Sequence, residues 1–488
     1  MEDTEDLENE VPPRRSWRWK LVGVVCLVLF LICFVSLYAP YKDEHKYFAN
    51  ALAWFRGEPM PDPAFSPLHV LALAWLPNPM RLSALVGFNL VVMVLALRYL
   101  GRIAAQGQRG DMLTNSSVAF FASFPALLFV AFSGLAEPTA LFGLLLALYV
   151  TLYGEKGLKS FALAFFGALL AAAARIDYAF YALGIVLALV LLRQWHWLRL
   201  AAMAGGALAG LALIAGIDSA CGAEFSLLRS HAALTQVGDQ PSMVGERLMR
   251  GVTAYLGDGW GMWYAPPLRW AGIVGLLTIA WVTRLRVHHG LFAMAFSGLL
   301  VFGMTDVANI VQGDGYLWRY MLVWLAPTSI FLFWGALYLA RRMKNANVAM
   351  GATVFVLGMF SIGQVFWFVT SIDTYYPQEF RALGRVVRNL PTLEGRVLAP
   401  RSALENYLLR AVDVTYAKPL GEYSAQELEA YAESQNITWL VLSSRWQGID
   451  EASLSTLAEG MTSFEVKSSH RDESSAETLI LLKRRTQP

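Results

Sequence analysis

Long apolar runs separated by short polar segments fill residues 21–373. Most of these runs are roughly 17 to 25 residues long, which is enough for an α-helix to cross the hydrocarbon core of a bilayer. The pattern therefore predicts a polytopic α-helical membrane protein with about 11 spans. The predicted spans are residues 21–39, 82–99, 113–132, 135–153, 159–175, 177–192, 198–216, 267–283, 290–305, 318–339 and 348–370.

The positively charged residues of the short loops predict the orientation of these spans. Lys and Arg concentrate in the loops that face the cytoplasm. Here they recur on one side of the predicted spans, so we expect residues 1–20 to be a cytoplasmic tail and the loops 40–81, 217–266 and 306–317 to lie outside. The basic residues used are Arg14, Arg15, Arg18, Lys20, Arg98, Arg102, Arg109, Lys156, Lys159, Arg193, Arg199, Arg284, Arg286, Arg341, Arg342 and Lys344.

A change of pattern near Thr374 marks a second domain. Charges become frequent, and short helical and strand patterns alternate over residues 374–488. The segments 395–399, 412–416, 437–443, 464–470 and 477–485 read as strands, and Ser424 with Glu427 forms a capping box before a helix. The pattern predicts a soluble α/β domain outside the membrane. It contains no phosphate-binding glycine loop and no metal-ligand cluster, so we expect it to have a supporting role.

Composition agrees with a membrane protein and excludes an ordinary soluble one. Of 488 residues, 56% are hydrophobic and 16% are charged, and the mean hydropathy is +0.45. We expect the first span to be a retained anchor rather than a cleaved signal peptide, because it is long and no clear small-residue cleavage site follows it. In a bacterium the protein would be a multi-pass protein of the inner (plasma) membrane, and we expect no nucleic-acid partner. Cys26, Cys33 and Cys221 suggest neither a disulfide framework nor a metal site.

Two adjacent carboxylates, Asp43 and Glu44, open the polar segment behind the first span. Acidic groups next to lipid are costly unless they are solvated or used, which makes the pair a candidate for the chemistry. Asp is also a favoured helix N-cap, so Asp43 has a purely structural alternative, and one carboxylate can serve both roles.

Further polar residues fall at the outer ends of the predicted spans. They were not used to derive the orientation, so their position on one side supports a site there. They are Asp62, His69, Glu137, Arg175, Asp177, Asp258, Trp260, Asp306, Asp314 and Arg319.

The segment DEHKYFANALAWFRGEP followed by PDPAFSPL combines an acidic pair, a juxtamembrane helix and a proline-containing return. In this order it resembles the GT-C superfamily of membrane glycosyltransferases, which includes aminoarabinose transferases and protein O-mannosyltransferases. The stretches FSGLAEPTALFGLLLALYVTLYGEKG and ALLAAAARIDYAFYALGIVLAL, and the late span YLWRYMLVWLAPTSIFLF, are also similar.

The resemblance implies a glycosyltransferase that moves a hexosyl or pentosyl group from a polyprenyl-phosphate donor to a glycan, lipid or protein acceptor, with inversion. It implies that Asp43 is the catalytic carboxylate and that Glu44 orients the acceptor or a divalent cation. A base within reach of the acceptor hydroxyl suits such a transfer, and a cation stabilises the departing phosphate. Arg175 and Arg319 are the candidate phosphate ligands, and Glu137, Asp177, Asp62 and His69 are candidate substrate-binding residues.

Structural alternatives accompany these assignments. Arg175 fits an ion pair with Asp177, Arg319 fits snorkelling toward the interface, and Glu137 fits a capping role at a helix start. The histidine pair at 288–289 falls in a predicted solvated cytoplasmic loop. No metal motif is recognisable, so a divalent cation is only a possibility and the metal is unknown.

The main rival function is a transporter or flippase of lipid-linked sugars. Such carriers often contain inverted repeats and helices broken near the bilayer centre. The second half of the chain does not repeat its opening segment, and the strongest polar residues lie at span ends. These features favour the enzyme.

Overall fold

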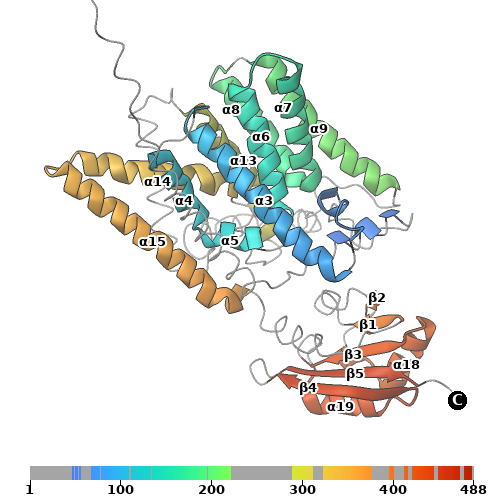
Figure 1. Ribbon diagram of the computed structural model, residues 1–488. Coiled ribbons are helices and arrows are strands. Elements are labelled where there is room, and N and C mark those ends of the chain that lie inside the picture. Colours follow the sequence, from blue (N-terminus) through green and yellow to red (C-terminus); the bar gives the residue numbers. More distant parts are fainter. Residues whose placement is uncertain are drawn as a thin grey trace, which may run out of the picture. The chain divides into compact units, whose positions relative to one another are not determined.

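A computed structural model provides the structure of the chain (Figure 1). It describes residues 47–48, 50–52, 54–55, 68–76, 78–108, 112–132, 134–194, 196–220, 288–310, 322–375, 395–399, 412–415, 420–444, 449–472 and 477–485. The described residues form two parts, the helices up to Tyr375 and the sheet that follows Gly395.

The first part consists of apolar helices. Their bounds are η2 (Leu68–Val70), α3 (Asn78–Ala104), α4 (Met112–Ala122), α5 (Pro125–Phe132), α6 (Glu137–Tyr153), α7 (Leu158–Ala174), α8 (Ile176–Leu191), α9 (Trp197–Ala220), α13 (His289–Ile310), α14 (Leu322–Arg341) and α15 (Ala346–Tyr375).

Several of these helices are suited to cross a membrane. Within the described residues, four are long and apolar enough, namely Ala84–Ala104 of α3, α9, α14 and Ala346–Phe366 of α15. Helices α6, α7 and α8 are apolar but shorter. The predicted class, a helical membrane protein with several apolar spans, is confirmed. The total of about 11 stays a prediction, because the spans 21–39 and 267–283 lie outside the described residues.

The expectation of one continuous span over 113–132 is wrong. The chain forms α4 up to Ala122 and a separate α5 from Pro125. Proline has no N–H to donate and disfavours a helical conformation in the residue before it. The Ser123 hydroxyl donates to the Phe120 carbonyl at 2.7 Å, and the helix restarts with the amides of Leu127 and Leu128 bonded to the Phe124 carbonyl.

Small residues allow the backbones of α6, α7 and α9 to approach closely. A Cβ built on Gly143 would lie 2.6 Å from the Gly167 oxygen, and one on Gly167 would lie 2.9 Å from the Gly143 oxygen. On the other side of α7, a Cβ on Gly206 would overlap the Phe165 carbonyl oxygen. Such contacts between small residues are a main source of helix association in membranes.

We expect Gly206→Ala to destabilise the protein, because the added methyl group meets backbone that cannot rotate away. Overpacking of this kind costs about 1–3 kcal/mol. The matched control is Gly216→Ala in the same helix, where a Cβ meets nothing within 4 Å and the higher helix propensity of Ala is neutral or helpful. Thermal unfolding of both purified variants in detergent measures the difference. Equal melting temperatures would contradict close backbone packing at Gly206.

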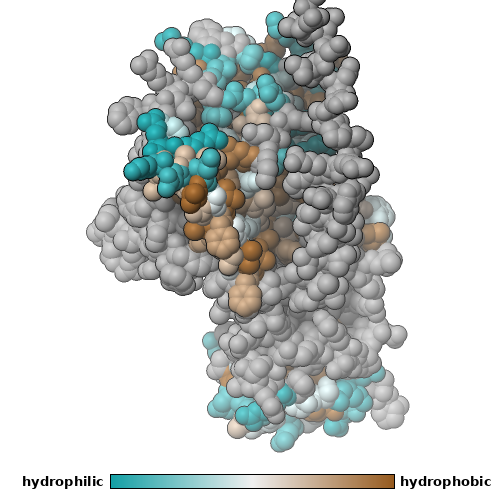
Figure 2. Space-filling model, turned by 60° about the vertical axis from the view of Figure 1, so that its left-hand side comes forward, coloured by the Kyte–Doolittle hydropathy of each residue, from teal (hydrophilic) through white to brown (hydrophobic). Residues whose placement is uncertain are grey.

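Helix α15 is attached to the other helices along a narrow face. It packs against α4, α5 and α14, yet only 6% of its Ala346–Phe366 window is buried. Figure 2, which brings forward the side of Figure 1 that carries α15, shows hydrophobic residues in a band below a hydrophilic patch. Large side chains of α15, including Phe355 and Phe366, are exposed. An exposed apolar helix of this length fits contact with lipid.

The second part is a five-stranded mixed sheet with the order β2-β1-β3-β5-β4. The strands are β1 (Val397–Ala399), β2 (Val412–Thr415), β3 (Trp439–Ser443), β4 (Phe464–Asp472) and β5 (Glu477–Arg484). β1 pairs in parallel with β2 and β3, whereas β5 is antiparallel to β3 and β4. The predicted C-terminal α/β domain and its five strands are confirmed. Thr374, where the second domain was expected to begin, lies in the last turn of α15, and the domain boundary stays a prediction. The helices expected over 378–390 and 402–411 lie outside the described residues.

Two α-helices accompany this sheet, together with the short 3-10 helix η5 (Leu420–Glu422). Helix α18 (Ala425–Ser434) begins with the predicted capping box, in which Ser424 and Glu427 exchange hydrogen bonds. Helix α19 (Glu451–Glu459) was not expected; its N-cap is Asp450, which accepts from the Ser453 amide at 2.7 Å. Leucines of both helices and of strands β1, β3 and β5 form one buried cluster.

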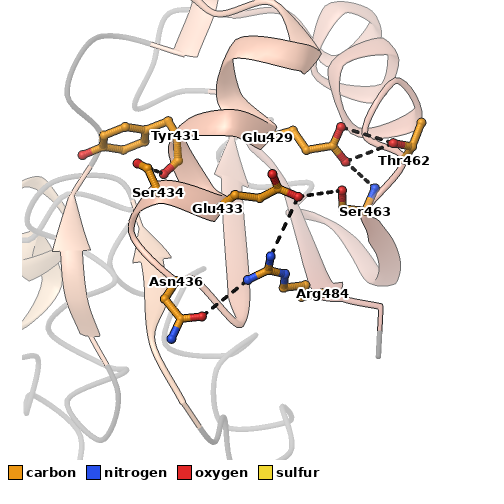
Figure 3. A network of polar contacts seen from close by, with 8 residues as sticks. All are labelled: Glu429, Tyr431, Glu433, Ser434, Asn436, Thr462, Ser463 and Arg484. Carbon is orange, nitrogen blue, oxygen red and sulfur yellow. Dashed lines mark hydrogen bonds and ion pairs between the residues drawn. The ribbon is translucent and has the colours of Figure 1, made fainter. Parts of the chain in front are cut away.

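A polar network fastens α18 to the loop before β4 and to the end of β5 (Figure 3). Glu429 accepts hydrogen bonds from the Ser463 amide and from the Thr462 hydroxyl. Burial raises the pKa of Glu429, but the hydrogen bonds from Ser463 and Thr462 outweigh it and hold the pKa below its usual value. Arg484 lies 3.8 Å from the Glu433 carboxylate. These contacts hold α18 against the sheet, and the supporting role of the domain stays a prediction.

Candidate functional site

Three charged residues meet where α6 begins, α7 ends and α8 begins. Glu137 is the first residue of α6 and is followed by Pro138, while Arg175 separates α7 from α8 and Asp177 lies in the first turn of α8. Arg175 has extended backbone, with φ −149° and ψ 128°. This single non-helical residue lets two helices meet end to end and directs its side chain back to α6.

Arg175 links the two carboxylates. Its Nη1 donates to Glu137 Oε1, and its Nε donates to Asp177 Oδ1 at 2.9 Å. The Glu137 side chain is fully buried, whereas the side chains of Arg175 and Asp177 are 14% and 13% exposed. Ion pairs this well shielded from water retain much of their Coulomb attraction. We call Glu137, Arg175 and Asp177 the charged triad.

Helix dipoles favour the two carboxylates of the triad, because Glu137 and Asp177 lie at helix N-termini, where the dipole is positive. Arg175 lies between the C-terminus of α7 and the N-terminus of α8, where the two dipoles have opposite effects on its charge. The sequence alternative of Glu137 as a capping residue is not observed: the N-cap position is Ala136, and it makes no side-chain cap bond. The alternative of an Arg175–Asp177 ion pair is observed.

The segment before α6 is held in place by a buried amide. Asn89 of α3 is fully buried, and its Nδ2 donates to the Leu135 carbonyl at 2.8 Å. Leu135 and Ala136 are also fully buried. This anchoring fixes the start of α6 and therefore the position of Glu137.

The chain just after the acidic pair packs beside the triad. Tyr47, Phe48 and Ala51 are helical and form a cluster with η2 and with Ala136, the neighbour of Glu137. His69 of η2 is buried, and its ring meets that of Tyr47 edge to face with centroids 4.3 Å apart. η2 also contacts α7.

The structure therefore brings together four of the residues singled out from the sequence. Glu137, Arg175 and Asp177 are in contact, and His69 lies in the adjoining cluster. Asp306 is part of α13, and its side chain is not among those described. Asp43, Glu44, Asp62, Asp258, Trp260, Asp314 and Arg319 lie outside the described residues.

Sequence reasoning missed three buried polar residues inside apolar helices. Asn89 in α3, Asp218 in α9 and Gln364 in α15 are each at most 1% exposed. Each was visible as a lone polar letter in an apolar run, which in a membrane helix points to the interior of the bundle.

The opposite ends of these helices are basic. Arg199 donates to the Val150 carbonyl at 3.2 Å and to the Gly154 carbonyl at the end of α6. The Arg102 guanidinium lies 5.6 Å from the centre of the Tyr149 ring. The two ends of the bundle thus differ in charge, as the positive-inside pattern predicts. Which end faces the cytoplasm stays a prediction.

The expected solvated loop at residues 288–289 is wrong. His289 begins α13, and its Nε2 lies 3.4 Å from Gln194 Nε2. His288 is partly buried against Trp334, with ring centroids 4.8 Å apart. Burial lowers the pKa of His288 to about 4, so the ring is neutral at physiological pH.

No cation site can be assigned among the described residues. They include no group of three or more His, Cys, Asp or Glu placed to hold a metal ion. The carboxylates of the charged triad are engaged by Arg175. They therefore act first as the partners of a guanidinium.

Apolar helices followed by a small mixed sheet, with polar residues gathered where α6 to α8 meet, define the class as a helical membrane protein with a C-terminal sheet domain. The solved structures that share this fold include two of ArnT from Cupriavidus metallidurans. The structure bound to undecaprenyl phosphate matches with a TM-score of 0.56 and 11% identity, covering 96% of this chain and 98% of that one. The apo structure matches with a TM-score of 0.52 and 12% identity over the same shares.

At such identities the similarity establishes the fold and leaves the chemistry to be argued. The resemblance inferred from short sequence motifs is confirmed at that level. No protein-family model and no curated protein match the sequence.

Proposed function

We propose that this chain is a membrane glycosyltransferase that moves a hexosyl or pentosyl group from a polyprenyl-phosphate donor to a glycan, lipid or protein acceptor. One observation carries the proposal: nearly the whole chain shares its fold with a structure of ArnT bound to undecaprenyl phosphate. We place the reaction at the outer face of a bacterial inner membrane, with the sheet domain outside. The positive-inside pattern supports this placement.

In the proposed reaction, Asp43 acts as the base. Its carboxylate takes the proton of an acceptor hydroxyl while that oxygen forms a bond to the anomeric carbon. The bond from this carbon to the phosphate oxygen breaks, and the electron pair leaves with the polyprenyl phosphate. Attack from the side opposite the phosphate inverts the anomeric centre. Glu44 orients the acceptor or a divalent cation.

Covalent geometry supports an acidic pair close to the charged triad. Three residues of chain lead from Glu44 to Tyr47, and so short a stretch spans at most about 11 Å. Tyr47 belongs to the cluster that contains Ala136, next to Glu137. We propose that Glu137, Asp177 and His69, together with Asp62, belong to the wall of the substrate site.

We propose Arg319 as the main ligand of the donor phosphate and Arg175 as a second one. Bidentate hydrogen bonds from a guanidinium suit a phosphate near lipid. Arg175 already holds two carboxylates, so it binds phosphate only by sharing or releasing one of them. The charge that develops on the leaving phosphate would make this exchange most favourable during transfer.

The function is tested with purified protein and a panel of polyprenyl-phosphate sugars. Release of free polyprenyl phosphate and labelling of an acceptor fraction would support the transferase. If the protein is instead a carrier, intact lipid-linked sugar will move between the leaflets of proteoliposomes without being cleaved. Transport without any cleavage across the panel would overturn the proposal.

The orientation leads to a labelling prediction. In a protein without its native cysteines, a cysteine is introduced at Glu459, which is exposed on α19. In intact cells it should react with a thiol reagent that crosses the outer membrane but not the inner membrane. A cysteine at Asn345, which is exposed between α14 and α15, should react only after lysis. Replacing Ser424 with cysteine would be less suitable, because the Ser424 side chain caps α18. The reverse pattern would place the sheet domain in the cytoplasm.

A further inference from the structure

Helix α15 has one fully buried side chain in its described membrane portion, and that side chain is polar. Its inward face is the stripe Thr353, Leu357, Phe360, Ser361 and Gln364, whose spacing follows one side of a helix. The first four are partly exposed, whereas Gln364 is 1% exposed. A helix that meets its neighbours along so narrow a face would normally place its deepest contact on an apolar residue.

The amide of Gln364 has no hydrogen-bond partner in the described structure. Both Nε2 and Oε1 are buried, and neither is paired. An unpaired buried polar group costs about 1–3 kcal/mol of stability. A methionine of similar length would carry no such cost, so a buried and unpaired glutamine at this position indicates a use for the amide.

Gln364 lies near the break between α4 and α5. The Phe360 ring contacts that of Phe120 at a centroid distance of 6.0 Å, and α15 packs on both α4 and α5. Figure 1 shows α4 and α15 running in the same direction, with the short helix α5 turned away from the axis of α4. Gln364 is one turn beyond Phe360, and the break at Ser123–Phe124 is one turn beyond Phe120. The two therefore lie at the same level. Broken helices at membrane depth are tolerated where they line polar space.

We propose that Gln364 is a binding residue for hydroxyl groups of the sugar substrate, in a site between α15 and the α4–α5 break. This inference rests on the proposed function and adds a specificity-determining residue to it. A neutral amide offers two N–H donors and one carbonyl acceptor, which matches neighbouring sugar hydroxyls. An anionic phosphate is better served by arginine.

Sugar hydroxyls can come from the donor or from a glycan acceptor, and melting temperatures distinguish the two. Purified wild type and Gln364→Met are heated alone, with undecaprenyl phosphate, and with undecaprenyl-phosphate sugars. We expect Gln364→Met to melt at an equal or higher temperature without ligand and to respond to undecaprenyl phosphate like the wild type. If the donor sugar is bound, the additional stabilisation by the sugar is lost in the variant. If the acceptor glycan is bound, that stabilisation is retained and the acceptor KM rises about tenfold.

Thr353→Val is the matched control. Thr353 lies on the same stripe, and its hydroxyl donates to the Ala349 carbonyl of its own helix at 2.8 Å, so ligand responses should not change. A Gln364→Met protein that matches wild type with every donor and acceptor would overturn the inference. Failure of Gln364→Met to fold would overturn it too, because the amide would then serve the structure. No response of the wild type to any lipid phosphate, and no transfer, would instead overturn the proposed function itself and this inference with it.

Discussion

Asp43→Asn is expected to abolish transfer while leaving the protein folded. Asn has nearly the same volume as Asp and is an equally good N-cap, so a capping role survives the change. The amide cannot accept the proton of the acceptor hydroxyl. General-base catalysis supplies about 10²- to 10⁴-fold, and we expect a loss in kcat of at least the lower value. Turnover of undecaprenyl-phosphate sugars by purified wild type and variant measures it.

The controls separate catalysis from capping. Asp43→Ala removes both roles and should also lower helix stability by about 1 kcal/mol. Glu44→Gln should lose less activity than Asp43→Asn, because an orienting carboxylate is not the base. Transfer at the wild-type rate by a folded Asp43→Asn protein would eliminate Asp43 as the base. Glu44 would then become the leading candidate.

Arg175→Ala is expected to destabilise the protein strongly. Its removal leaves Glu137, which is fully buried, and Asp177 without their shared guanidinium. Breaking a buried ion pair by removing one partner costs about 3–5 kcal/mol, because a buried charge is left uncompensated. Thermal unfolding in detergent should show this as a markedly lower melting temperature. Arg341→Ala, at an exposed helix end, is the control and should change stability by less than about 0.5 kcal/mol.

A double variant distinguishes the structural role of the triad from phosphate binding. Glu137→Gln in the Arg175→Ala background removes the stranded charge and should restore part of the lost stability; coupling between contacting residues is about 0.5–3 kcal/mol. If Arg175 also binds phosphate, the restored protein still binds undecaprenyl phosphate more weakly than wild type. If Arg175→Ala alone is as stable as wild type, the triad is not a structural element.

Regular elements with strong local signals were predictable from the sequence. The uninterrupted apolar run at Trp439–Ser443 became a strand with every residue buried, and the Ser424 and Glu427 pair capped a helix as its spacing indicates. Helix α19 also carried a signal, an Asp450 cap before Leu454, Leu457 and Ala458 at helical spacing, but its otherwise polar composition concealed it. The break at Pro125 was missed because α4 and α5 are both apolar, so the hydrophobic run continues across it.

The sequence predicted the end of the helix bundle at which the site lies, but not most of the contacts within it. Arg175 and Asp177 are close in sequence, so their ion pair was foreseeable. Glu137 is 38 residues from Arg175, and the sequence indicated only that both lie at the same ends of their spans. That Arg175 reaches Glu137 depends on the close approach of α6 and α7 at Gly143 and Gly167. The unpaired amide of Gln364 has no sequence signature beyond a polar letter in an apolar run.

The separation of Glu137 and Arg175 along the chain also bears on biosynthesis. Arg175 follows Glu137 by 38 positions, a length of chain that takes about 2–8 s to synthesise at about 5–20 residues per second. During that interval α6 presents an acidic residue to the membrane before its counterion exists. Insertion of α6 is therefore most favourable together with α7 and the start of α8, as a three-helix unit whose charges are neutralised on arrival. Nascent chains truncated before Arg175 should integrate α6 less efficiently than chains that extend beyond it.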